Sequence, residues 1–185
     1  MKTAVYSGTF DPLHIGHLAI METLTRETDF DWVYLVVSPQ NPWKGERNRM
    51  TAQRRYEAAV DAVARHPGLR VRVDDIELQM EPPQYTIRTL HALSRREPDT
   101  RFTLVIGGDN LAGIRRWRSY KSILTRYGVA VYPRRGYDIA ALRADLLAEN
   151  RRYRIRLLDA PIVDISSTEI REGEKAGRDM SAFKM

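Results

Sequence analysis

The chain has 185 residues, of which 43% are hydrophobic and 29% are charged, with 11 Gly and 9 Pro. This composition is ordinary for a globular protein and excludes collagen, coiled coil and wholesale disorder, and the length predicts one domain over residues 1–185. Cysteine is absent, which excludes disulfide frameworks, cysteine-ligated zinc, iron–sulfur clusters and thiol nucleophiles.

Basic residues outnumber acidic ones by 30 to 24, so the formal net charge is +6, and only five of the thirty are Lys. Arginine binds phosphate and carboxylate groups through a planar, bidentate contact, so anionic ligands are worth seeking, although a solvated basic surface also explains such an excess. The N-terminus has no apolar stretch of signal-peptide length, and no later run approaches a membrane span. We therefore expect a soluble, cytoplasmic protein without a membrane partner.

Strand-like and helix-like apolar patterns alternate along the whole chain. Short apolar runs predict strands, in chain order, at Lys2 to Tyr6, Trp32 to Ser38, Leu69 to Val73, Arg101 to Gly107, Gly128 to Tyr132 and Ile155 to Leu158. Spacings of three and four residues predict helices from about Leu18, from Thr51 to about Arg65, from Thr86 to about Arg96, around Trp117, from Ile139 to Leu147 and from Ser167 to about Lys175. The alternation predicts an α/β fold, a single-domain, Rossmann-like, doubly wound parallel sheet with helices on both faces.

The loops that follow strands deserve the closest reading, because open parallel sheets bind ligands beyond the carboxyl ends of their strands. The longest of these loops, Pro39 to Met50, carries two prolines and several basic residues, and its length suggests a mobile lid.

The loop after the first predicted strand has the sequence SGTFDPLHIGH. Gly8 allows a tight turn after the strand, and Gly16 puts a position without a side chain at the start of a helix whose amides attract phosphate. His14 and His17 are three residues apart, so both imidazoles can lie on one side of that helix start and donate Nε2–H bonds to one anion. Metal ligation is the alternative, but Asp11 alone would be a poor third ligand, so phosphate binding is favoured.

The last predicted helix begins in the sequence ISSTEIR. Ser166 and Glu169 match a capping box, which satisfies the backbone at the helix start. The consecutive hydroxyl residues Ser166, Ser167 and Thr168, with Arg171 on the next turn, also form a set of phosphate donors. One helix start can serve both purposes.

The segments GTFDPLHIGH and ISSTEIR together resemble the two signatures of the nucleotidyltransferase superfamily that transfers AMP or CMP, and within it the chain most resembles bacterial nicotinate-nucleotide adenylyltransferases. The resemblance covers nearly the whole chain and includes PWK at residues 42–44, QYTIRTL at 84–90 and GGDNL at 107–111, followed by Trp117. Trp43 and Gln84 depart from the family pattern, so contacts to the acceptor can differ locally.

The resemblance implies adenylyl transfer from ATP to nicotinate mononucleotide, giving deamido-NAD and pyrophosphate, in NAD biosynthesis. It implies catalytic roles for His14 and His17, with His17 on the α-phosphate. The sequence shows no serine–histidine–carboxylate nucleophile set, so direct displacement without a covalent enzyme intermediate is expected. Magnesium is expected between the phosphates of ATP, held mainly by ATP oxygens and water, without a metal site formed by protein ligands. The residues implied in ATP binding are Gly8, Thr9, Phe10, His14, His17, Gly107, Asp109, Ser166, Ser167, Thr168 and Arg171.

The residues implied in binding the acceptor are Lys44, Tyr85, Thr86, Trp117 and Arg134. Thr86, at a predicted helix N-cap, can offer its hydroxyl and nearby amides to a nicotinate carboxylate, or it simply caps the helix. Trp117 can stack on the pyridinium ring or belong to the core. Lys44 and Arg134 are partners for the mononucleotide phosphate, unless they are solvated charges. Asp109, one of the residues implied in ATP binding, can accept a hydrogen bond from a ribose hydroxyl of ATP or from its adenine end. Alternatively, Asp109 only stabilises the local turn.

Three other functions compete with this one. The acceptor could be nicotinamide mononucleotide or phosphopantetheine, depending on how the region of Thr86 and Trp117 treats the head group. Class I aminoacyl-tRNA synthetases share the string HIGH, but they need a longer chain and a KMSKS segment that is missing here. A basic nucleic-acid-binding protein would use the arginines at 115, 116, 118, 151, 152, 154 and 156, but this leaves both end motifs unexplained, so nucleic acid is not expected as a partner. Whether the chain forms a homo-oligomer stays open.

Overall fold

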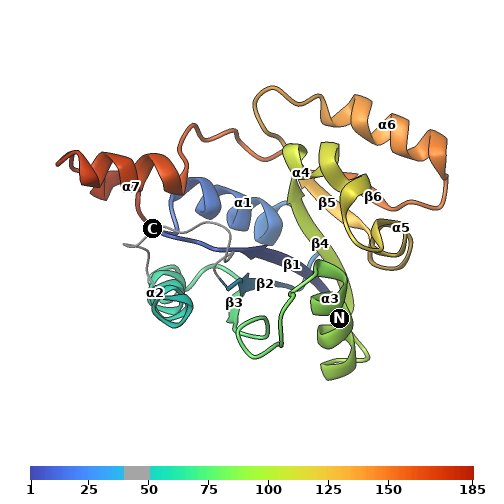
Figure 1. Cartoon of the computed structure of the whole chain (residues 1–185), viewed down its shortest axis with the longest axis horizontal. Helices are drawn as coiled ribbons and strands as arrows, with labels where there is room; N and C mark the ends of the chain where they lie inside the picture. Colours follow the sequence, from blue (N-terminus) through green and yellow to red (C-terminus); the bar gives the residue numbers. More distant parts are fainter. Residues whose placement is uncertain (40–50) are drawn as a thin grey trace.

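The computed structural model describes residues 1–39 and 51–185, and Figure 1 shows the sheet in the middle of the molecule with helices packed around it. The six strands are β1 (Lys2–Gly8), β2 (Trp32–Val37), β3 (Val71–Asp74), β4 (Arg101–Gly107), β5 (Val129–Tyr132) and β6 (Ile155–Leu157). All neighbouring strands pair in parallel, in the order β3-β2-β1-β4-β5-β6. The predicted doubly wound α/β sheet is confirmed, and its strand order reverses between β1 and β4, where such folds bind their ligands.

Helices connect successive strands, and the last α-helix follows β6. They are α1 (Ile15–Arg26), α2 (Ala52–Ala64), α3 (Thr86–Arg96), α4 (Gly108–Gly113), α5 (Tyr120–Ser122), α6 (Ile139–Glu149) and α7 (Ser167–Lys175), with the short turns η1 (Ile114–Arg116), η2 (Ile123–Tyr127) and η3 (Ser181–Phe183). Within the described ranges, no helix combines the length and apolar character that crossing a bilayer requires.

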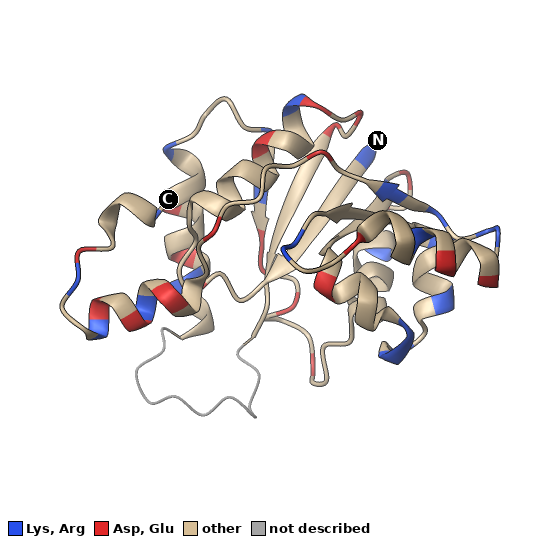
Figure 2. Cartoon of the chain, turned by 90° about the horizontal axis from the view of Figure 1, so that it is seen from above, with Lys and Arg blue, Asp and Glu red and all other residues tan. Residues whose placement is uncertain are grey.

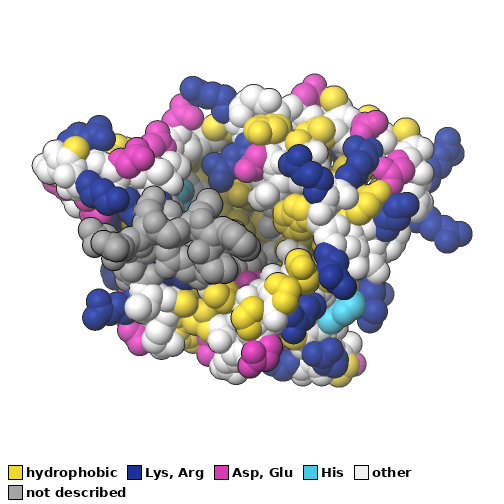
Figure 3. Space-filling view, viewed as in Figure 1, with side chains coloured by type: hydrophobic (Ala, Val, Ile, Leu, Met, Phe, Trp, Pro, Cys, Tyr) yellow, Lys and Arg dark blue, Asp and Glu magenta, His cyan; other side chains and the backbone are white. Residues whose placement is uncertain are grey.

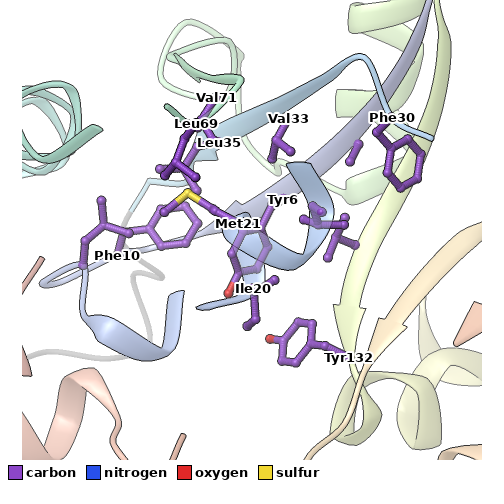
Figure 4. Close-up of a cluster of buried hydrophobic side chains, with 14 of the residues drawn as sticks. Tyr6, Phe10, Ile20, Met21, Phe30, Val33, Leu35, Leu69, Val71 and Tyr132 are labelled. Carbon is purple, nitrogen blue, oxygen red and sulfur yellow. The ribbon is translucent and has the colours of Figure 1, made fainter. Parts of the chain in front are cut away.

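Two separate apolar cores cover the two faces of the sheet. In β1, Ala4 and Tyr6 pack with α1 and α2, whereas Val5 packs with α3, η2 and α6 on the opposite face. Successive side chains of a strand point to opposite faces, so a strand buried on both sides has to be apolar throughout. Figure 4 shows the first of these cores, with the rings of Tyr6 and Tyr132 side by side, their centroids 6.0 Å apart in an edge-on arrangement.

The observed bounds differ from the predicted ones in a few places. The first strand continues to Gly8, and the third runs from Val71 to Asp74, two residues later than its predicted start. Trp117 was predicted within a helical stretch, but it is extended, with φ −78° and ψ 141°, and it separates η1 from α5. Apart from Pro39, the predicted lid lies outside the described residues.

A buried carboxylate joins the carboxyl ends of β1 and β2 to α3. Glu77 is 4% exposed, and its Oε1 accepts hydrogen bonds from Thr89 Oγ1 at 2.8 Å and from Ser7 Oγ at 3.2 Å. The Ser7 hydroxyl also lies 2.9 Å from that of Ser38, at the end of β2. Because a buried carboxylate is costly without donors, this group holds three elements in register at the edge where ligands would bind.

Two buried threonines allow a matched test of this network. Thr89 donates to Glu77, whereas the hydroxyl of Thr3 is buried without a partner among the described residues. We expect Thr89→Val to lower the free energy of unfolding by about 1–3 kcal/mol, because it leaves a buried acceptor short of a donor. Thr3→Val should leave the free energy unchanged or raise it by about 1 kcal/mol, because it removes an unsatisfied buried hydroxyl. Urea denaturation measures both, and equal effects of the two substitutions would contradict the role of Glu77.

Candidate active site

Two stacked histidines begin α1 at the carboxyl end of β1. His14 is the N-cap of α1, and its Nδ1 accepts a hydrogen bond from the N–H of Gly16 at 3.1 Å. His17 Nδ1 accepts one from the N–H of His14 at 3.2 Å, and the centroids of the two rings are 3.7 Å apart. With both Nδ1 atoms occupied as acceptors, each neutral ring carries its proton on Nε2 and can donate it to a ligand.

The helix start was expected to offer its own amides to phosphate, and this expectation is wrong for Gly16. The Gly16 N–H donates its hydrogen bond to His14 Nδ1, the N-cap side chain, and is therefore not free to bind a phosphate. A Cβ at Gly16 would lie 3.0 Å from the His14 ring, so glycine is needed for the ring to fold back over the helix start. The Gly16 amide is therefore not available to an anion, whereas the hydrogen bonds described above involve the Nδ1 atoms of the two imidazoles and not their Nε2–H groups.

The surroundings of the two histidines keep them neutral. Burial lowers the pKa of His14 from 6.5 to about 4, and the positive charge of Arg134 adds to this effect, while Glu169 opposes it. Burial also lowers the pKa of His17 well below its usual value, with further contributions from His14 and Arg134. At neutral pH both rings are uncharged donors.

The tight turn after β1 is made by Phe10 rather than by Gly8. Phe10 has φ +47°, in the left-handed region, and its ring is 5% exposed. The ring contacts Tyr6 and His17 edge-on, at centroid distances of 5.4 and 5.1 Å. A Cβ at Gly8 would lie 3.0 Å from the Phe10 ring, so Gly8 provides room for the side chain that supports His17. Phe10, predicted to bind ATP, thus lies behind the histidines as a buried support.

Arg55 holds the same loop from α2, and the sequence reading did not single it out. It is 2% exposed, and its Nη1 donates to the carbonyl of Ser38 at 2.8 Å and to the carbonyl of Thr9. The signal that could have revealed it is its place with Ala59 and Ala62 in the buried stripe of α2, at spacings of four and three residues. Thr9, one of the predicted ATP-binding residues, is exposed and is fixed through its carbonyl.

The start of α7 docks onto the loop between β1 and α1. Ser167 Oγ donates to the carbonyl of Pro12 at 2.9 Å, and Arg171 Nη1 donates to the carbonyl of Asp11 at 2.5 Å. Arg171 Nη2 also donates to Thr168 Oγ1 at 3.1 Å. The two end motifs, about 150 positions apart in the sequence, therefore meet as expected. The donors of Ser167 and Arg171 already hold the loop, while Thr168 stays exposed.

The predicted cap at the start of α7 forms only in part, because the Glu169 side chain contacts the Ser166 hydroxyl and makes no hydrogen bond to the Ser166 backbone N–H that a capping box requires. Ser166 is the N-cap, its Oγ accepts from the N–H of Glu169 at 3.2 Å, and it lies 2.6 Å from Glu169 Oε2. The side chain of Ser166 is thus occupied by the helix, so its predicted role in ATP binding would have to involve its remaining hydrogen-bonding capacity.

Asp109 and Arg134 meet at the carboxyl ends of β4 and β5. Asp109 lies in the first turn of α4, and its Oδ1 is 3.8 Å from Arg134 Nε. The guanidinium of Arg134 lies 5.3 Å from the centre of the Tyr132 ring. A Cβ at Gly107 would lie 2.4 Å from Asp109 Oδ1, so this glycine allows the carboxylate to fold back toward β4.

A narrow hollow of about 30 Å³ lies between these elements. His14, His17 and Arg134 line it together with residues 161–163, which were not predicted, and with Ile165, the first residue of the ISSTEIR segment. It can take a water or a single phosphate oxygen but not a nucleotide, so a nucleotide would contact its rim. Arg134, predicted as a partner of the mononucleotide phosphate together with Lys44, lies beside the histidines, and Lys44 is outside the described residues.

The remaining predicted acceptor residues gather at the start of α3. Thr86 was expected to be the N-cap, but the N-cap is Tyr85, without a side-chain bond to the helix, and Thr86 is the first helical residue. The guanidinium of Arg118 lies 5.0 Å from the centre of the Tyr85 ring, which brings the segment after η1 next to α3. Trp117 is partly buried and packs against the core that includes α3, which agrees with the alternative that it belongs to the core.

The chain matches the family model described as cytidylyltransferase-like over residues 5–173. A protein of Cytophaga hutchinsonii named "probable nicotinate-nucleotide adenylyltransferase" is 37% identical over 171 residues, which cover 92% of this chain and 84% of the relative. A protein of Porphyromonas gingivalis with the same name is 37% identical over 180 residues, covering 97% of this chain and 87% of the relative.

The fold is also similar to that of a solved structure, a Plasmodium falciparum nicotinic acid mononucleotide adenylyltransferase complexed with NaAD. The two share a TM-score of 0.80 at 16% identity, over 97% of this chain and 87% of that chain. By the extent of the match and by identity, this chain belongs to the cytidylyltransferase-like family, among the nicotinate-nucleotide adenylyltransferases.

Proposed function

We propose that this protein transfers the adenylyl group of ATP to nicotinate mononucleotide, forming deamido-NAD and pyrophosphate in NAD biosynthesis. The observation that carries the proposal is the meeting of the His14–His17 pair and the start of α7 on one loop at the switch point of the sheet. The names of the relatives and the NaAD complex of the similar Plasmodium falciparum enzyme support the choice of substrates.

The chemistry proposed is a single in-line displacement. A phosphate oxygen of the mononucleotide forms a bond to the α-phosphorus of ATP, and the bond from that phosphorus to the pyrophosphate oxygen breaks. Such a reaction needs positioning and neutralisation of charge more than covalent help from the protein. The Nε2–H groups of His14 and His17 are fixed donors for the α-phosphate oxygens, and His17 is assigned to the charge that develops in the transition state.

The start of α7 is assigned to the phosphates that leave. The hydroxyl of Ser167 already donates to Pro12, so we assign its backbone N–H and that of Thr168, which the helix cannot satisfy, to the β- and γ-phosphates. The exposed Thr168 hydroxyl and the partly exposed Arg171 add polar and positive groups. Glycines 8 and 107 and Asp109 are kept as ATP-side positions, the last for a ribose hydroxyl or the adenine side.

Magnesium is proposed to enter with ATP. Among the described residues, no group of three or more His, Asp and Glu side chains could hold a metal ion. The ligands proposed for the ion are mostly ATP oxygens and water. When bound, the ion neutralises charge on the phosphates.

The acceptor is proposed to lie against the start of α3. Tyr85 provides no side-chain cap, so the first amides of α3 and its positive dipole end favour a carboxylate over an amide. Arg118, held against the Tyr85 ring, adds positive charge to the same region. Thr86, Trp117, Lys44 and Arg134 stay acceptor-side predictions.

A basic nucleic-acid-binding protein is a weaker explanation of the arginine excess. On the face seen in Figure 3, Lys and Arg side chains are interspersed with acidic ones. Several arginines of the sequence also pair with carboxylates, as Arg115 does with Asp145 at 2.8 Å and with Glu149 at 2.9 Å. We also propose a cytoplasmic location, because the reaction consumes ATP. The formation of a homo-oligomer stays a prediction to be tested.

The first test measures pyrophosphate release with ATP and magnesium and each acceptor separately. We expect turnover with nicotinate mononucleotide and much slower turnover with nicotinamide mononucleotide and phosphopantetheine, because the start of α3 favours an anionic head group. Equal rates with the nicotinate and nicotinamide forms would contradict the assigned specificity. A lack of pyrophosphate release with every acceptor would contradict the proposed function.

The second test removes one imidazole. His17→Ala should lower kcat by ~100-fold or more, the scale of losing one transition-state donor, with a smaller change in KM. His66→Ala, which removes a histidine just beyond α2, is the matched control and should keep full activity. Full activity of the His17 variant would exclude the mechanism proposed here.

The third test follows stability with pH. The pKa of His14 is about 4 in the folded state and 6.5 as a free group, so protons bind the unfolded state more tightly. The stabilising contribution is complete above pH 6.5 and declines as pH falls toward 4, with a loss of about 1–2 kcal/mol at pH 5. His14→Asn, which can still cap α1 but does not titrate, should show a smaller decline in urea denaturation between pH 7 and 5. Parallel curves for both proteins would refute this assignment.

A further inference from the structure

A second, larger cavity lies at the amino-terminal edge of the sheet, opposite the histidines. Its volume is about 810 Å³, and its walls come from the first residues of β1, β4, β5 and β6, from the end of α3 and from the segment before β2. In Figure 2 the basic start of β1 lies beside the N-terminus at this edge. None of the residues assigned to adenylyl transfer lines this cavity.

The walls carry strongly unbalanced charge. Five basic residues line the cavity, Lys2, Arg101, Arg126, Arg154 and Arg156, against one acidic residue, Asp29. We call this space, with these five residues on its walls, the basic cavity.

The one carboxylate of the basic cavity is already engaged. Asp29 lies 2.7 Å from Lys2 Nζ and 2.5 Å from Arg156 Nη1, and these contacts hold the pKa of its carboxyl well below the usual value. Arg101, Arg126 and Arg154 make no ion pair with any carboxylate of residues 1–39 or 51–185. Three of the arginines that line this space thus have no carboxylate partner within the described chain.

Local packing holds part of this wall in place. Gly128 has φ +79°, and a Cβ there would lie 2.9 Å from Arg154 Cβ and 3.0 Å from its carbonyl oxygen, so the two backbones pass in close contact. The guanidinium of Arg126 lies 5.6 Å from the centre of the buried Tyr127 ring. Hydroxyls of Thr100 and Thr103 line the same cavity and can add neutral donors.

We propose that the basic cavity binds a small ligand that carries two or more phosphate groups. Its volume falls within the range of small-molecule sites, ~300–1,000 Å³, and guanidinium forks match phosphate oxygens. A cavity of this volume suits a molecule about as large as a nucleotide better than the extended backbone of a nucleic acid. Strands β1 and β4 run from this cavity to the candidate active site. A ligand in the cavity would therefore contact the amino ends of these two strands, and the residues assigned to adenylyl transfer lie at their carboxyl ends.

The experiment is an NMR titration of the full chain with inorganic tripolyphosphate as the probe, following backbone amides at both edges of the sheet. We expect saturable shifts at Thr103, Gly128 and Arg154, separate from any shifts at Gly16 and Thr168. In a triple variant, Arg101→Ala, Arg126→Ala and Arg154→Ala, the shifts at Thr103 and Gly128 should require at least about tenfold more probe, because three charge-assisted contacts are lost. Alanine keeps the Cβ of residue 154, and pyrophosphate release by this variant should be unchanged.

The matched control replaces three exposed arginines outside the basic cavity, Arg95→Ala, Arg151→Ala and Arg152→Ala, with the same change in net charge. It should bind the probe at the cavity as the unmodified protein does. Three outcomes would overturn the proposal: no saturable shift at the cavity amides, equal weakening in both triple variants, or binding of a single-stranded RNA oligonucleotide at these amides that is tighter than that of tripolyphosphate. The last would assign the surface to nucleic acid instead.

Discussion

The loop between β1 and α1 is restrained on both sides, and the arrangement of the active site depends on this restraint. From one side, Ser167 and Arg171 of α7 donate to the carbonyls of Pro12 and Asp11. From the other, the buried guanidinium of Arg55 donates to the carbonyl of Thr9. Backbone carbonyls in a loop need donors when they are buried, and here these donors come from elements distant in sequence. The loop that presents both histidines is therefore built by the tertiary structure.

The same restraint explains why the histidines can act as donors of fixed orientation. Each Nδ1 accepts a backbone N–H, one from Gly16 and one from His14, so the tautomer and the ring position are both set before a ligand binds. Burial and the charge of Arg134 keep the rings neutral. A preorganised neutral donor does not have to reorient during the reaction, which is the main requirement of electrostatic catalysis.

The two edges of the sheet differ in how they treat charge. At the carboxyl edge, buried Glu77 and exposed Asp109 lie among donors and cations that satisfy or partly balance them. At the amino edge, three arginines of the basic cavity lack carboxylate partners within the described chain. Concentrated positive charge repels itself and attracts anions, so this edge is the second place where the molecule is suited to a phosphorylated ligand.

Periodicity along the chain was enough to predict the α/β class, the alternation of strands and helices and the bounds of α3 and α7, because the apolar pattern of each element records which of its faces is buried. The spacing of His14 and His17 and the hydroxyl run at 166–168 were enough to identify both halves of the candidate site. Patterns of this kind do not show which donor each carbonyl receives. Two of these features are local, namely the support of His17 by Phe10 and the internal use of the Gly16 amide. The burial of Arg55 and Glu77 and the position of Arg134 beside the histidines follow from contacts between segments at least 12 residues apart. The long-range contacts form only when the sheet brings the strand ends together, and for that reason only the folded molecule decides them.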